Sequence, residues 1–381
     1  MFKSYKYRIY PSEQQKDHMT KIFGCVRFVY NLGLETKIQA YASARVNIDC
    51  FTLNKQITDL KKEATWLREA QGQALQASIA NLDNAYTAFF KGAGFPKFKN
   101  KYSKQSFSIP QYAEVDFDKC KVYIPKLKWI DCIFDRQFKG NIKTVTVSKT
   151  KTNKYFVSIL VDNQKELPTK PEITEKTTIG IDFGIKDLAI LSDGTKIPNP
   201  KWFKQSQKRL RVEQRKLSRK CKPKAKEQSK GYLKQKLVVA KLHEKIRNQR
   251  IDYLHKLTTS ITKKYDTIII EDLNVSGMIK NHKLAKAIAD VSWSEMKRQL
   301  EYKCDWYGKN LLTIGRFDPS SKTCSSCGKI NKELTLKDRE WSCICGIKHD
   351  RDHNAAKNIK HFGLRNIKGF RIEPSDVKVV H

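Results

Sequence analysis

Three short acidic segments in the second half of the chain carry residue types that bind divalent metal ions. They are Ile179-Gly-Ile-Asp-Phe-Gly184, Ile268-Ile-Ile-Glu-Asp272 and Asp350-Arg-Asp-His-Asn-Ala-Ala356. Hydrolysis of a phosphodiester by paired divalent cations needs carboxylates that come from distant parts of a chain to one point. Strand ends and the start of a helix can bring them there. The three segments together therefore predict phosphodiester cleavage.

The first acidic segment, residues 178 to 184, has the alternation of a β-strand. Its two isoleucines and Phe183 fall on one face, whereas Asp182 lies on the other face between Gly180 and Gly184. Because glycine has no side chain, this arrangement is expected to leave room for metal ions and a phosphate near Asp182. The alternative is that Asp182 is an ordinary acid at a strand end before a turn.

The other two segments place acids at the ends of predicted elements. Glu271 follows an apolar run, residues 267 to 270, that is suited to a buried central strand. An acid in that position must be solvated, paired or bound to a metal ion. Asp352 precedes a short predicted helix from Asn354 to Ile359 that ends at Gly363, so Asp352 could alternatively be the N-cap of that helix.

Four cysteines form a cluster with the spacing C-x2-C-x15-C-x-C, namely Cys324, Cys327, Cys343 and Cys345. This spacing predicts a structural zinc ribbon with tetrahedral thiolate ligands. The second pair is C-x-C where most ribbons have C-x2-C, which leaves open whether Cys345 or His349 completes the site. The other cysteines are scattered and are interpreted as packing residues: Cys25, Cys50, Cys120, Cys132, Cys221 and Cys304.

The composition points to a polyanionic partner. Lysine and arginine number 75 against 39 acids, a formal net charge of +36 over 381 residues. Nucleic acid is the partner that this charge favours. No apolar run approaches the roughly 20 residues of a transmembrane helix, and the first residues lack the apolar region of a signal peptide. We therefore expect an intracellular protein of two to three domains without a membrane partner.

The first 165 residues are predicted to be a β-rich module with a helical insertion. Strand patterns occur at residues 5–9, 122–124, 145–147 and 156–161, and Ser12 with Gln15 predicts a capped helix start. Helical spacing extends over residues 52 to 91. Several aromatic side chains are expected to be exposed and able to stack on bases, although packing within the chain explains them equally well: Tyr5, Tyr7, Tyr10, Phe95, Phe98 and Tyr102.

Prolines at positions 168 and 171 mark a predicted boundary before a second domain. Strands at 178–183, 187–191 and 195–197 would form an antiparallel meander, and residues 310–314 a further strand. Residues 201 to 250 carry 19 basic residues against three glutamates, which predicts a helix pair with one apolar side. Its basic side could track a phosphate backbone or could simply be solvated.

The chain resembles TnpB, the family of RNA-guided nucleases carried by bacterial insertion sequences and related to type V CRISPR effectors. The resemblance is strongest in Gly180-Ile-Asp-Phe-Gly184, Ile270-Glu-Asp-Leu273, Ser320-Ser-Lys-Thr-Cys-Ser-Ser-Cys-Gly328 and the Asp350 to Ala356 segment. Shorter matches carry it through the first half: Tyr7-Arg-Ile-Tyr-Pro11, Phe28-Val-Tyr-Asn31, Gln73-Ala-Leu-Gln76 and Phe95-Pro-Lys-Phe-Lys99.

The resemblance implies an α+β multidomain fold. An N-terminal, wedge-like β-barrel would span residues 1–165 with a helical recognition insertion at about 12–95. An RNase H-like RuvC domain would span 172–318 and 350–363, with a zinc ribbon at 319–349 and a C-terminal tail at 364–381. The catalytic acids would be Asp182, Glu271 and Asp352, which would hold two Mg²⁺ ions.

The implied activity is cleavage of target DNA, double-stranded and single-stranded, beside a short adjacent motif. The implied guide is an RNA derived from the end of the insertion sequence, and the implied location is the bacterial cytoplasm at the nucleoid. Two other functions remain open: an RNA-guided repressor that does not cleave, which the intact acids disfavour, and a DNA transposase. The guide, the adjacent motif and the oligomeric state cannot be read from the sequence.

Overall fold

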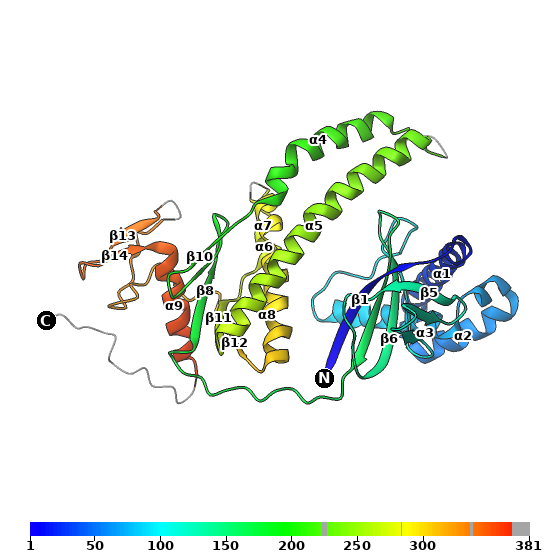
Figure 1. The fold of residues 1–381 in the computed structure, drawn as a ribbon, viewed down its shortest axis with the longest axis horizontal. Coiled ribbons are helices and arrows are strands. Elements are labelled where there is room, and N and C mark those ends of the chain that lie inside the picture. The colour runs from blue at the N-terminus through cyan, green and yellow to red at the C-terminus, as the bar shows by residue number, and fades with distance from the viewer. Residues whose placement is uncertain (223–226, 283, 336–337, 368–381) are drawn as a thin grey trace. The chain divides into compact units, whose positions relative to one another are not determined.

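The computed structural model describes residues 1–222, 227–282, 284–335 and 338–367. The chain divides into two compact units, Met1–Glu166 and Leu167–His381 (Figure 1). Residues 368–381, most of the predicted tail, lie outside the described part. Within that part, no helix is both long and apolar enough to cross a membrane.

The first unit contains a seven-stranded antiparallel sheet with the order β2-β6-β7-β1-β5-β4-β3. Its strands are β1 (Phe2–Tyr10), β2 (Gln105–Ile109), β3 (Glu114–Asp116), β4 (Lys121–Ile124), β5 (Lys128–Ile133), β6 (Asn141–Lys149) and β7 (Tyr155–Asp162). All four strand patterns seen in the sequence lie within β1, β4, β6 and β7. The sheet ends at β2 and β3, which do not pair with each other among the described residues, so a closed barrel is not confirmed.

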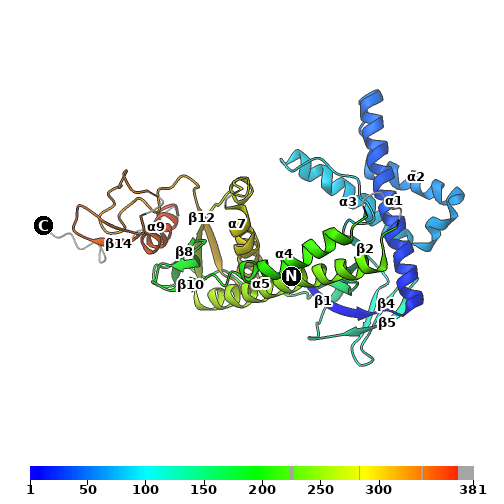
Figure 2. The same ribbon diagram turned by 90° about the horizontal axis from the view of Figure 1, so that it is seen from above.

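Three helices and a 3₁₀ turn separate β1 from β2: α1 (Glu13–Ala44), α2 (Cys50–Glu63), η1 (Thr65–Glu69) and α3 (Gly72–Phe90). Figure 2 shows the three helices grouped together beside β2. The predicted cap is confirmed, since the Gln15 amide donates to Ser12 Oγ at 3.3 Å and Gln15 Oε1 accepts from the Ser12 amide at 2.9 Å. The helical pattern over 52–91 is interrupted at η1, where the turn buries Leu67 in the core.

The second unit is built on a five-stranded mixed sheet with the order β10-β9-β8-β11-β12. The strands are β8 (Thr178–Phe183), β9 (Asp187–Leu191), β10 (Lys196–Pro198), β11 (Thr267–Glu271) and β12 (Asn310–Ile314). β8, β9 and β10 form the expected antiparallel meander, and β11 runs parallel to both β8 and β12. Parallel neighbours require crossover connections, which the helices of this unit supply.

Helices cover both faces of this sheet (Figure 1). On one face, Ile268 and Ile270 pack with Leu254 of α5 (Lys230–Lys264) and Met296 of α8 (Trp293–Tyr307). On the other face, Ile269 packs with Ile359 and Leu364 of α9 (Arg351–Arg365). The remaining helices are α4 (Trp202–Lys220), α6 (Val275–Met278) and α7 (Ala285–Val291). Each face of the central strand therefore has its own apolar core.

Helix α9 differs from its prediction at both ends. It begins at Arg351, before the predicted start at Asn354, and continues through Gly363 to Arg365. Gly363 does not end the helix. A Cβ atom at that position would lie 2.4 Å from Ile269 Cγ2. The glycine instead allows α9 to approach β11 closely.

Helices α4 and α5 form the expected basic helix pair. Leu210 and Ile246 are buried on its apolar side. The basic side chains of both helices are exposed along most of their length, for example Arg211, Arg215, Lys234 and Lys241. The pair therefore offers a strongly cationic surface within the second unit.

Candidate active site

Strand pairing brings Asp182 and Glu271 side by side at one edge of the sheet. Ile181 of β8 is opposite Ile270 of β11 in a parallel pair, so the next residue of each strand is one of the two acids. Side chains alternate between the faces of a strand. Asp182 therefore shares the face of Gly180, and Glu271 shares the face of Ile269, which is the face that α9 covers.

Asp352 lies in the first turn of α9, and its charge acts on Asp182. The helix lies so close to β8 that a Cβ atom on Gly180 would be 2.3 Å from the Ala356 carbonyl oxygen. The space beside Asp182 that was expected to admit metal ions and a phosphate is thus filled, at Gly180, by helix backbone. This expectation was wrong for Gly180, whose function is to seat the helix that carries the third acid.

Gly184 serves the turn into β9. A Cβ atom there would lie 2.7 Å from the Asp187 carbonyl oxygen, and the Gly184 amide donates to the Leu188 carbonyl at 3.3 Å. The two glycines beside Asp182 therefore have separate structural causes, a helix contact and a tight turn. Neither follows from the alternation of the strand alone.

The charges of the other two acids act on Asp182. Burial, followed by the negative charges of Glu271 and Asp352, raises the pKa of Asp182 to about 8. Burial also raises the pKa of Glu271, although a hydrogen bond from Ser320 Oγ to Glu271 Oε1, at 2.5 Å, opposes that shift. Buried carboxylates that repel one another favour either a proton or a cation among them. The site thus has the electrostatics of a cation-binding site.

Asp352 is held by two arginines. Arg339 Nη1 donates to Oδ2 at 3.0 Å, and Arg351 donates to Oδ1 through Nε at 3.1 Å and Nη2 at 2.9 Å. The sequence interpretation did not single out either arginine. Ser320 belongs to the Ser320 to Gly328 motif, so the sequence contained a signal for it, whereas nothing in the sequence alone links Arg339 to Asp352.

The neighbouring acids have other partners. Asp350 is the N-cap of α9, since its Oδ1 accepts from the amides of Asp352 and His353 at 3.1 and 3.0 Å. Its Oδ2 accepts from Lys196 at 2.6 Å. Burial acts to raise the pKa of Asp350, but these hydrogen bonds outweigh it and lower the pKa. The interpretation of Asp352 as the helix cap is therefore wrong.

Asp272 and Glu271 have different interaction partners. It pairs with Lys297 at 3.0 Å and with Arg316 at 3.2 Å. The hydrogen bond and charge of Lys297 lower the pKa of Asp272, in contrast to the raised pKa of Glu271. The two adjacent acids thus differ in chemistry, and Glu271 is the one that shares an environment with Asp182.

The cysteine cluster fits a zinc ion. Within the described residues, the ligand atoms of Cys324, Cys327, Cys343 and Cys345 all lie within 4.8 Å of one another. Two of the sulfur pairs are 3.8 and 3.6 Å apart. A tetrahedron with Zn–S bonds of about 2.3 Å has edges of roughly 3.8 Å. The cluster lies beside a short ribbon of β13 (Glu340–Ser342) and β14 (Lys348–Asp350).

His349 lies beside the cluster. Its buried ring packs on Trp341 with centroids 4.8 Å apart, and Nε2 is 3.0 Å from Cys324 Sγ. Burial lowers the pKa of His349, which favours the neutral ring. Because four sulfur atoms already form a complete tetrahedral set, this geometry favours His349 as a hydrogen-bond partner of a sulfur ligand.

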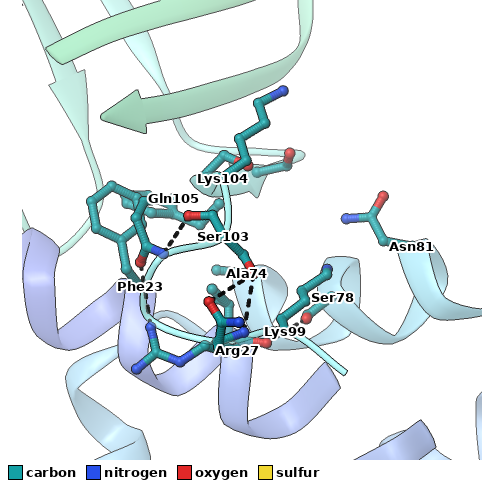
Figure 3. A pocket seen from close by; sticks show the side chains of 14 residues that line it. Phe23, Arg27, Ala74, Ser78, Asn81, Lys99, Ser103, Lys104 and Gln105 are labelled. Carbon is teal, nitrogen blue, oxygen red and sulfur yellow. Dashed lines mark hydrogen bonds between the residues drawn. The ribbon is translucent and has the colours of Figure 1, made fainter. Parts of the chain in front are cut away.

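The first unit contains a polar cavity of about 70 Å³ between α1, α3 and β2 (Figure 3). Arg27 donates to Gln105 at 3.4 Å across one wall. Lys99 lies 3.4 Å from the centre of the Tyr30 ring, and burial lowers its pKa. The cavity thus offers amide, hydroxyl and cationic groups, but no group of acids among its lining residues.

The aromatic side chains of the first unit divide into two groups. Tyr7 is buried and its hydroxyl donates to the Arg136 carbonyl at 2.9 Å, so its expected exposure was wrong. Tyr5 is partly buried and packs against the same core. The others are exposed as expected: Tyr10, Phe95, Phe98 and Tyr102.

Three stretches of the chain match known protein families. Residues 158–282 match the family described as "Probable transposase" (OrfB_IS605), and residues 293–359 match "Cas12f1-like, TNB domain". Residues 1–45 match "Helix-turn-helix domain". In the structure that last stretch is a strand, β1, followed by one long helix, α1.

Relatives match nearly the whole chain. A "Putative RNA-guided DNA endonuclease" of Streptomyces pristinaespiralis is 37% identical over 370 residues, 95% of this chain and 89% of the relative. The "Putative RNA-guided DNA endonuclease InsQ" of Escherichia coli (strain K12) is 34% identical over 375 residues, 93% of this chain and 91% of the relative. The "TnpB-like protein L770" of Acanthamoeba polyphaga mimivirus is 25% identical over 398 residues.

The fold is similar to that of a chain in the cryo-EM structure of a Cas12f1–sgRNA–target DNA complex. The TM-score is 0.56 over 94% of this chain and 98% of that chain, at 14% sequence identity. The relatives define the class, a family whose members carry the name RNA-guided DNA endonuclease. This chain belongs to it, the TnpB family.

Proposed function

We propose that this protein is an RNA-guided, Mg²⁺-dependent DNA endonuclease that uses Asp182, Glu271 and Asp352. The proposal is supported by the pairing that sets Asp182 beside Glu271, and by the charges of Glu271 and Asp352, which with burial raise the pKa of Asp182 to about 8. The strand order of the second unit, an antiparallel meander joined to two parallel strands, supports an RNase H-like RuvC domain.

The three acids would hold two Mg²⁺ ions, which supply activation of water and stabilisation of the leaving 3′-oxygen. The chain's own residues orient these acids. The Ser320 hydroxyl holds Glu271, and the partly buried Arg351 holds one oxygen of Asp352. Arg339 is half-exposed on the other oxygen, where it can stay paired or turn toward a bound phosphate.

The cysteine cluster would hold a structural zinc ion that keeps α9 in place. The Arg351 amide donates to the Arg339 carbonyl at 2.8 Å, which joins the ribbon to the helix start. Buried Asn354 and Asn358 both donate to the Thr323 carbonyl, at 2.7 and 2.6 Å, directly before Cys324. The ribbon and the helix that carries Asp352 thus form one hydrogen-bonded body.

The net charge of +36 supports binding to RNA and DNA. In our proposal the first unit holds most of a guide RNA transcribed from the end of an insertion sequence, and base pairing selects the target DNA. The basic pair of α4 and α5 contributes further phosphate contacts.

Isolation of the protein with its RNA, followed by sequencing of that RNA, tests the guide. The complex is then incubated with DNA that matches the guide, with and without Mg²⁺, beside the Asp182→Ala variant. Guide-dependent, Mg²⁺-dependent cleavage by the native protein alone is the expected result. Guide-dependent binding without cleavage would indicate a repressor, and joined DNA strands would indicate a transposase.

A further inference from the structure

The loop between β12 and the cysteine cluster lies against the acid site. Ser320 Oγ donates to Glu271 Oε1 at 2.5 Å, and Arg316 Nη2 donates to Asp272 Oδ2 at 3.2 Å. Arg316 Nε also donates to the Asp272 carbonyl at 3.4 Å. Both ends of the segment from 316 to 320 are thus attached to the two residues that end β11.

The middle of this loop is a hydrogen-bonded turn. The Asp318 amide donates to the Gly315 carbonyl at 3.2 Å, and the Gly315 amide donates to Asp318 Oδ2 at 2.8 Å. The Ser320 amide donates to the Asp318 carbonyl at 2.8 Å. Phe317 occupies the third position of the turn, so its backbone is held while its side chain is exposed.

Phe317 is 92% exposed, the largest exposed fraction of any large apolar side chain in the described part of the chain. An aromatic ring in water on a well-bonded turn gains nothing for folding, because burial is what makes apolar surface favourable. The groups near Phe317 indicate what kind of ligand its ring could bind. They are a half-exposed arginine and an acid edge suited to phosphodiester chemistry.

We propose, resting on the nuclease function above, that Phe317 is a stacking platform for an unpaired base of the DNA strand that enters the acid site. Every base has a π-face, so an aromatic ring binds bases of any sequence, and Arg316 adds a cation for the backbone. A paired base within a duplex exposes its edges and not its faces. The platform therefore favours a single strand over a duplex.

The position of the base can be bounded from the chain. The Cα atoms of Phe317 and Ser320 are separated by three peptide units, at most about 11 Å. A stacked strand advances by roughly 3.4 Å per nucleotide, so this separation spans about three nucleotides. The side chains of Phe317, Ser320 and Glu271 extend it by roughly as much again, so the base is expected within about six nucleotides of the bond that is cut. This window defines the experiment.

The experiment uses the complete protein–RNA complex and target DNA in which one abasic residue is moved, one position at a time, through that window. The native protein should lose roughly 5- to 100-fold in cleavage rate at one position, the range expected for one stacked base. Phe317→Ala should cleave the unmodified target slower by a similar factor. It should show no additional loss at that position, because the stacking partner is already absent.

An aromatic and an aliphatic replacement of Phe317 separate stacking on a base from packing within the protein. Phe317→Trp should keep the native rate and the native abasic profile, whereas Phe317→Leu should behave like Phe317→Ala. Zinc content and RNA binding, measured for each variant, report its folding. If Phe317→Leu restores cleavage, or if native protein and Phe317→Ala show parallel abasic profiles, the stacking proposal is overturned.

A binding measurement tests Phe317 independently of cleavage. Single-stranded DNA containing 2-aminopurine is added to complexes that carry Asp182→Asn, so that the strand stays intact. The native ring should quench the fluorescence at one position, and Phe317→Leu should not. Equal quenching by both would overturn the proposal. A native complex that quenches normally but cleaves no guide-matched target would instead overturn the proposed function.

Discussion

The cysteine cluster and the acid site are two candidate metal sites in one unit, and their donor atoms are arranged differently. The four sulfur atoms already lie within 4.8 Å of one another. Among the described residues, no group of three acids meets that distance. Instead, Glu271 and Asp352 are held by hydrogen bonds from Ser320, Arg339 and Arg351.

The difference follows from where the donors come from. The cysteines lie within 22 residues, on two short turns, so one short segment of the chain brings them together. The acids come from β8, β11 and α9, and their charges oppose close approach. Structural zinc sites are closed, whereas catalytic metal sites keep open positions for water and substrate. The cysteine cluster, whose four sulfur atoms form a complete set, matches the first description.

The largest expected effect concerns the three acids. Single replacement of Asp182, Glu271 or Asp352 by Ala should abolish guide-directed cleavage, because each change removes a metal ligand and not a phosphate contact. Guide RNA binding, measured by filter retention, should stay at the native level. The matched controls are the adjacent acids, and Asp350→Ala and Asp272→Ala should be milder. If Asp352→Ala kept full cleavage while Asp350→Ala lost it, the third ligand would be Asp350 and not Asp352.

The cysteine cluster should respond through its metal content. Purified protein should hold about one Zn²⁺ per chain, and Cys324→Ser or Cys327→Ser should release it, with a loss of cleavage because α9 loses its support. His349→Ala is the control: it should keep zinc with about 10- to 100-fold weaker affinity, as expected for a partner of a ligand. Mass spectrometry measures the zinc content of each variant. Zinc loss in His349→Ala with retention in Cys345→Ser would make the histidine the fourth ligand.

The acid site should show a pH dependence that is set by the proton on Asp182. With a pKa of about 8, Asp182 carries a proton at pH 7 that a metal ion must displace. Affinity for Mn²⁺, a probe for Mg²⁺, should therefore rise with pH up to about 8, by at most about tenfold per unit, and then level off. Calorimetry in two buffers should detect release of about one proton at pH 7. A flat profile from pH 6 to 8.5 would contradict the raised pKa.

Without metal, the same group should make the fold less stable as pH rises. A carboxyl whose pKa is raised in the folded state binds its proton more tightly there, so its contribution is favourable at low pH and declines as pH rises toward 8. Added Mn²⁺ should remove this decline. Thermal unfolding of the metal-free protein at pH 6 and pH 8.5 makes the comparison.

The smallest effect lies outside both sites, on α4 and α5. Replacement of Arg211, Arg215, Lys234 and Lys241 by Gln should flatten the salt dependence of nucleic-acid binding by about one unit of slope per lost phosphate contact. Zinc content and Mn²⁺ affinity should stay unchanged. Lys256→Gln on the same helix is the control, since Lys256 already pairs with Asp252 at 2.8 Å. An unchanged slope would show that this surface is only solvated.

The sequence predicted the strands that carry two of the three acids because the signals for those strands are local. The apolar run before Glu271 and the alternation around Asp182 each describe one strand, and the strands formed where expected. The function of Gly180 could not be predicted in the same way. It depends on a helix that begins 171 residues later and passes over β8, and such long-range contacts leave no periodic pattern in either segment.

The same reasoning explains the differences at α9 and in the first unit. Glycine often ends a helix, but α9 continues through Gly363, where the missing side chain lets the helix pack against Ile269. The alternation of residues in β1 does not say which face of the strand is buried. The rings of Phe134 and Phe138 pack on Tyr7 and place it on the buried face. Closure of a barrel depends on whether β2 meets β3, which no single strand pattern specifies.

Helix α9 also has a consequence for synthesis of the protein on the ribosome. Chains grow from the N-terminus, and folded units form as they emerge. The first unit, β8 and β11 leave the ribosome with two of the three acids, but the third arrives only with α9, which must then insert its asparagines against the Thr323 carbonyl. With the catalytic acids that we propose, the nascent chain can begin to bind its RNA before the acid site is complete. In our proposal, DNA cleavage becomes possible only after α9 has been made.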